Sequence, residues 1–109
     1  MERLVRDWNE RGCTVAVTGT AIELQKLLEC TCIREAQLVG FVPLEAAEAA
    51  VIADLGQPVW NLEALASQPP QVLLVASTLG QRQLCERFAG QLTRFGVEIT
   101  GFYETGAQF

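Results

Sequence analysis

The sequence contains no histidine among its 109 residues. Histidine is the commonest metal ligand and general base, and it activates the serine or cysteine of most nucleophile pairs. The acidic residues Glu45, Glu48 and Asp54 form no tight carboxylate pair that could replace it. We therefore expect no catalytic residue and no independent enzymatic activity.

Basic residues are also few. The chain has 8 Lys and Arg against 13 Asp and Glu, a formal net charge of −5. Proteins that bind nucleic acid present a basic face to the phosphates, so we expect no nucleic-acid partner. No apolar run approaches the roughly 18 to 20 residues of a membrane span. The N-terminal stretch MERLVRDWNERG lacks the apolar segment of a signal peptide, which predicts a cytoplasmic protein without membrane contact.

Cysteine is present, but its spacing does not favour a metal site. The four cysteines are Cys13, Cys30, Cys32 and Cys85, and without a secretion signal we expect them to be reduced. A structural zinc ion needs four N or S ligands, and Cys13 and Cys85 lie far in sequence from the Cys30-Thr31-Cys32 pair. We predict no metal site and interpret the pair as small, half-buried packing residues. A vicinal redox pair is the alternative.

The remaining sequence alternates between two kinds of apolar segment. Helices are predicted over residues 2–11, 21–29, 44–54, 61–66 and 80–95. Strands are predicted over residues 13–18, 36–42, 58–60, 71–77 and 97–103. The third strand is short and is expected at a sheet edge, because Pro58 offers no donor to a ladder.

Strands that alternate with helices predict an α/β fold with a parallel sheet and right-handed crossovers. We expect one small Rossmann-like, three-layer domain over residues 1–109, with a leading helix at 1–11 and a frayed tail at 104–109. Five strands in the order 3-2-1-4-5 place the switch point between strands one and four. Ligands of open α/β sheets bind at that point, so it is the predicted pocket.

Aromatic and apolar side chains suggest how the helices are held and where partners bind. Trp8 is predicted to attach the first helix to the sheet, and Trp60 to contact a ligand or partner. The last helix is expected to bury one stripe, formed by Leu84, Phe88, Leu92 and Phe95. Because the final strand carries few charges on an exposed edge, homodimerisation through that strand or the last helix is a further prediction.

The stretch VAVTGTAIELQKLL, residues 15–28, is typical of a strand, a glycine turn and a helix. The free N–H groups and the dipole of a helix N-terminus attract anions. The candidate binding residues are therefore Gly19, Thr20 and Ala21, through their backbone N–H groups. Ser77 and Thr78, after the fourth strand, would add hydroxyls across the same crevice. The predicted ligand is a small anion such as a nucleotide or nucleotide-sugar.

The same turn has a purely structural interpretation. Thr20 and Glu23 match a T-x-x-E capping box, and Thr78 starts a T-x-x-Q match. A Glu23 carboxylate folded over the first turn would repel a phosphate. Ala21 and Leu24 also replace the second and third glycines of a dinucleotide fingerprint. Both interpretations stay open at this stage.

Several segments together resemble a known family. RGCTVAVTGT, AQLVGFV, GQPVWNLEAL, PPQVLLVAS and FGVEITGFY follow, in order and spacing, the Rossmann-like nucleotide-sugar-binding-type domains attached to bacterial sugar acyltransferases and sugar C-methyltransferases. Gly19 matches the first glycine of that turn and Ala76-Ser77 the end of the fourth strand, whereas Pro43 stands at the acidic position. The resemblance implies a module whose catalytic partner is a neighbouring domain, standing alone here or cut from a longer chain.

The sequence therefore predicts a non-catalytic accessory or binding module, with a nucleotide or nucleotide-sugar between strands one and four. The alternative is a structural or protein-interaction domain with a vestigial cradle, which dimerises through an edge strand or the last helix or binds a partner enzyme domain.

Overall fold

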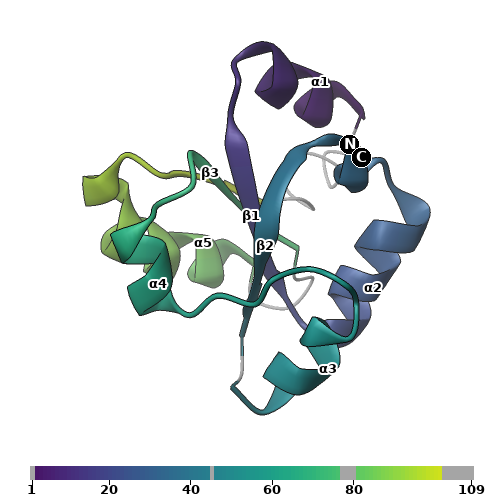
Figure 1. Cartoon of the computed structure of the whole chain (residues 1–109). Helices are drawn as coiled ribbons and strands as arrows, with labels where there is room; N and C mark the ends of the chain where they lie inside the picture. Colours follow the sequence, from purple (N-terminus) through teal and green to yellow (C-terminus); the bar gives the residue numbers. More distant parts are fainter. Residues whose placement is uncertain (1, 45, 77–80, 102–109) are drawn as a thin grey trace.

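The computed structural model describes residues 2–44, 46–76 and 81–101, in which strands alternate with helices (Figure 1). The helices are α1 (Glu2–Glu10), α2 (Ala21–Cys30), α3 (Ala49–Ala53), α4 (Leu62–Ser67) and α5 (Gln81–Leu92). The strands are β1 (Thr14–Gly19), β2 (Gln37–Pro43), β3 (Val72–Val75) and β4 (Glu98–Gly101). Short 3-10 turns occur at η1 (Ile33–Glu35), η2 (Ala46–Glu48) and η3 (Thr93–Phe95).

The four strands form one parallel sheet in the order β2-β1-β3-β4. Val17 is paired with Leu74 and Thr18 with Val75, so the predicted neighbours, the first strand and the strand at 71–77, do lie side by side. The α/β class and the parallel sheet are confirmed.

The predicted third strand, at residues 58–60, is wrong. Residues 58–60 contribute a single isolated bridge, in which the Phe41 N–H donates to the Pro58 carbonyl and the Trp60 N–H donates to the Phe41 carbonyl, both at 2.8 Å. Pro58 has no N–H, and the chain leaves the sheet directly after Trp60 to begin α4. The sheet therefore has four strands in the order β2-β1-β3-β4, and not five in the order 3-2-1-4-5.

Helices cover both faces of the sheet. Figure 1 places α2 and α3 on one side of β1 and β2, and α4 and α5 on the other. Two buried clusters follow this division. Val15 and Val17 of β1 join the cluster under α1, α2 and α3, whereas Ala16 joins Leu65 and Phe88 under α4 and α5. This alternation along one strand is the period of two that a sheet covered on both faces requires.

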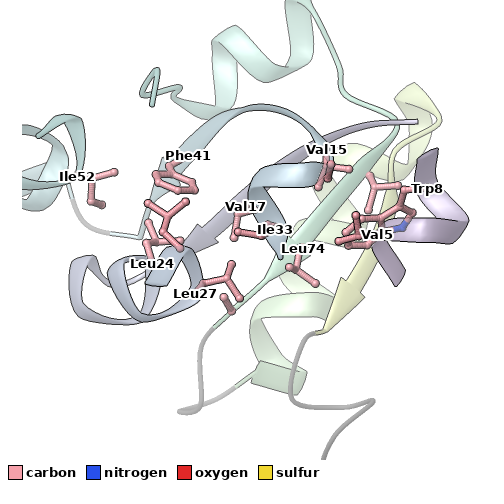
Figure 2. Packing of buried hydrophobic residues seen from close by; sticks show 14 of the residues in the cluster. Val5, Trp8, Val15, Val17, Leu24, Leu27, Ile33, Phe41, Ile52 and Leu74 are labelled. Carbon is pink, nitrogen blue, oxygen red and sulfur yellow. The ribbon is translucent and has the colours of Figure 1, made fainter. Parts of the chain in front are cut away.

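Trp8 attaches α1 to the sheet, as predicted. Its side chain is 1% exposed and lies in the first cluster with Val5. Figure 2 shows Trp8 and Val5 at one end of this cluster and Leu24, Phe41 and Ile52 at the other. The cluster thus runs beneath three helices.

The predicted stripe of the last helix is correct only in part. Phe88 and Leu92 are buried, but Phe95 is 38% exposed. The chain tightens into η3 over its last turn, so the α-helical spacing that placed Phe95 on the stripe no longer holds. The Arg94 guanidinium lies over the Phe95 ring instead, 4.8 Å from its centroid.

A β-bulge in β2 shapes the sheet edge. Val15 is paired with Leu38 but Ala16 with Gly40, so Val39 is an extra residue in the ladder. The Val39 carbonyl accepts a hydrogen bond from the Trp60 indole Nε1 at 3.0 Å. Gly40 has φ +150°, and a Cβ there would lie 2.4 Å from the Pro58 carbonyl oxygen and 2.6 Å from Trp60 Nε1. Only glycine lets the Trp60 segment approach β2 this closely.

Among the described residues, no helix is both long enough and apolar enough to span a membrane. The end of the predicted last strand at 102–103 and the predicted tail at 104–109 lie outside the described residues. Homodimerisation through β4 stays a prediction. On that strand, Glu98 is exposed and its carboxylate lies 3.4 Å from the Arg11 guanidinium.

Candidate functional site

Three strand ends meet at the carboxyl edge of the sheet. Gly19 is paired with Pro43 of β2, and on its other side the Ala76 N–H donates to the Thr18 carbonyl at 2.8 Å. Of the predicted binding residues, Gly19, Thr20 and Ala21 lie at this edge. The other two, Ser77 and Thr78, lie outside the described residues.

The backbone at Gly19 does not require glycine. Its φ is not positive, and an added Cβ would lie 3.4 Å from the Ala76 carbonyl oxygen, an ordinary van der Waals contact. The glycine of the turn therefore gives no sign of a backbone held close to a bound phosphate.

The capping box predicted from Thr20 and Glu23 is confirmed. The Glu23 N–H donates to Thr20 Oγ1 at 3.3 Å, and Glu23 Oε1 accepts from the Thr20 N–H at 3.2 Å and from Thr20 Oγ1 at 2.9 Å. The carboxylate is thus folded over the first turn of α2. Its negative charge complements the positive end of the helix dipole.

A second carboxylate approaches the same helix end from a different element. Glu48, the last residue of η2, places Oε2 3.4 Å from the Ala21 N–H. Two acidic side chains therefore lie where the phosphate of a nucleotide would bind, and Coulomb repulsion opposes a further anion there. Sequence reasoning anticipated Glu23, but it missed Glu48, because 27 residues separate Glu48 from Ala21.

Replacing Thr20 with alanine is expected to lower the free energy of unfolding by about 1 kcal/mol, because the cap of α2 loses its side-chain acceptor. Urea denaturation measures this change. Thr20→Ser is the matched control, since it keeps the hydroxyl and should stay close to wild type. Equal stability of the alanine and wild-type proteins would contradict a structural role for the box.

A separate groove opens beside the same edge, on the side of α5. Its cavity is about 350 Å³, within the range of small-molecule sites. The described residues that line it are Val42, Pro43, Leu44, Ala49, Val59, Trp60, Asn61, Arg87 and Phe88. Sequence reasoning singled out Trp60 as a contact residue, but it did not place Arg87 beside it. No sequence motif links these two residues.

The cysteines are spread over different environments. Cys13 is buried, Cys32 and Cys85 are half-buried, and Cys30 is exposed, which is more open than predicted. Within residues 2–44, 46–76 and 81–101, no three or more Cys, Asp or Glu side chains gather closely enough to hold a metal ion.

Comparisons of the chain with protein-family models, with curated proteins and with solved structures found no match. The resemblance to nucleotide-sugar-binding-type domains therefore stays a prediction.

Proposed function

We propose that this chain is a non-catalytic binding module in which the glycine turn before α2 is a structural cap and not a phosphate site. The observation that carries this proposal is the pair of carboxylates at the N-terminus of α2. Glu23 and Glu48 approach backbone N–H groups of Thr20 and Ala21, the groups that a nucleotide phosphate would need.

The competing function is nucleotide or nucleotide-sugar binding at the switch point. The adjacency of β1 and β3 favours it, because their carboxyl ends meet beside Gly19. The charge argument weighs against it. A phosphate brought to α2 must displace Glu48 or lie near both carboxylates, at a cost that low local dielectric increases.

The absence of histidine from the sequence supports a binding role without catalysis. The resemblance of the chain to accessory domains points the same way. In this proposal the domain contributes a binding surface, and any chemistry belongs to a partner enzyme domain.

A thermal-shift experiment with ATP, NAD, UDP-glucose and inorganic phosphate at millimolar concentration tests the proposal. At 100 times its dissociation constant, a ligand stabilises the folded state by about 2.7 kcal/mol, which raises Tm by about 10 °C in a small domain. We expect changes in Tm below about 1 °C for all four compounds, because Glu23 and Glu48 already occupy the N–H groups at the start of α2.

A Gly19→Val variant identifies the site if any of these compounds does bind. Valine at this position narrows the approach to the turn before α2. Stabilisation of the wild type by a nucleotide that is lost in Gly19→Val would overturn the proposal and establish the competing function.

A further inference from the structure

Helix α4 begins beside the groove, because its cap residue Asn61 is one of the lining residues. α4 has six residues, about 9 Å of helix, whereas the seven residues of β2 extend over about 23 Å. α4 begins at the Asn61 cap and leads along the chain towards the amino end of β3. Pro43 and Leu44 are half-buried there and border the groove.

Aromatic side chains form two parts of the groove wall. Phe88 is 3% exposed and belongs to the core cluster under α5, against which Trp60 is packed. The Trp60 indole is fixed by its hydrogen bond to the Val39 carbonyl and by the close approach to Gly40. The half-buried Trp60 indole held in this way favours a flat, apolar ligand.

A cation borders this apolar space. Arg87 is the one charged residue among the described residues that line the groove, so no described carboxylate in the groove neutralises it. Its guanidinium carbon lies 5.9 Å from the centroid of the Phe88 ring. A carboxylate or sulfonate in the groove could form charge-assisted hydrogen bonds with this guanidinium.

A larger hollow among the described residues lacks these features. It has about 520 Å³ between α1 and η1, and three carboxylates border it, those of Glu2, Glu10 and Glu35, with Arg6 as a cation. Its net charge is negative, and no aromatic residue is among those described at its border.

We infer that the groove bordered by Trp60, Arg87 and Phe88 binds a small planar organic monoanion, of the class of an aromatic carboxylate. The ring lies against the aromatic and aliphatic walls, and the acid group meets Arg87. The volume of about 350 Å³ suits a small molecule rather than a peptide. The inference rests on the proposed binding role, but it uses the groove beside α5 and not the N-terminus of α2.

A titration with 2-naphthoate followed by ¹H–¹⁵N NMR tests this inference. The chain has two tryptophans, and they lie in clusters on opposite faces of the sheet. We expect the Trp60 indole N–H resonance to shift in a saturable way, while that of Trp8 stays in place. No saturable shift of the Trp60 resonance up to several millimolar would overturn the inference.

Two pairs of variants locate the charge and the cavity. Arg87→Gln should weaken binding of 2-naphthoate about tenfold or more, and Arg94→Gln, a change in another exposed arginine close by in sequence, should leave it unchanged. Ala49→Phe should block the groove, whereas Ala50→Phe on the exposed side of α3 should not. The neutral 2-naphthamide should bind more weakly and should not respond to Arg87→Gln.

Equal affinity of the wild-type and Arg87→Gln proteins for 2-naphthoate would overturn the assignment of the anion to this arginine. This result is separate from the test of the proposed function. Nucleotide binding that depends on Gly19 would contradict the proposed function. It would not bear on whether the groove binds an aromatic carboxylate. Loss of naphthoate binding in Arg87→Gln supports ligand binding in the groove, whatever the result of the nucleotide test at the N-terminus of α2.

Discussion

A Gly40→Ala variant is expected to lose about 3 kcal/mol of stability, which lowers Tm by about 10 to 15 °C. Two effects combine. An alanine must adopt the φ of +150° that L-residues rarely take, and its Cβ would lie 2.4 Å from the Pro58 carbonyl oxygen. Because Pro58 is held by its hydrogen bond to the Phe41 N–H, that backbone cannot yield without breaking the bridge to β2.

The matched control is Gly90→Ala. Gly90 lies within α5, and a Cβ there would meet no atom within 4 Å. Alanine has the higher helix propensity, so this variant should be about 0.5 to 1 kcal/mol more stable than wild type. Differential scanning calorimetry compares the two. A Gly40→Ala protein that melts with the wild type would show that the edge segment is not held against β2 as described.

A Trp8→Ala variant is expected to lose about 3 to 5 kcal/mol, the range for removing a buried aromatic side chain. Trp8 is 1% exposed, and its removal leaves a cavity between α1 and the sheet. α1 has only nine residues and is too short to be stable without this contact. We therefore expect its amides to lose protection against hydrogen exchange before those of β1.

Trp8→Phe keeps part of the contact and should lose less stability than Trp8→Ala in urea denaturation. The exposed residue Glu10, on the same helix, supplies the surface control Glu10→Ala, which should change stability by less than about 0.5 kcal/mol. A Trp8→Ala protein as stable as this control would contradict the role of Trp8 as the anchor of α1.

The sequence contains enough information to predict most of the elements and the adjacency of β1 and β3. Helical spacing and β-branched runs are local signals, and the capping box of Thr20 and Glu23 is contained in four consecutive residues. The adjacency was predicted from the strand order of Rossmann-like sheets, in which the chain returns to the free side of the first strand.

The features that were missed depend on contacts between distant segments. An isolated glycine in a strand pattern indicates a bulge or a close approach. Nothing local, however, identifies Trp60 as the group that approaches Gly40. The 58–60 segment has strand-like residues, but only Phe41 pairs with it, so it does not extend into a fifth strand. Glu48 and Arg87 reach the two candidate sites only through the tertiary fold.

β1 precedes the other three described strands along the chain but lies in the interior of the sheet, so it cannot pair with either neighbour until much more of the chain is made. Its partners are distant, since the contact of Thr18 with Val42 spans 24 residues and that of Thr14 with Gln71 spans 57. None of the three described strand pairs can form as a local hairpin, because all of them are parallel. Such non-local pairing slows folding, and it leaves the apolar TVAV segment exposed on the ribosome until β2 and later β3 emerge.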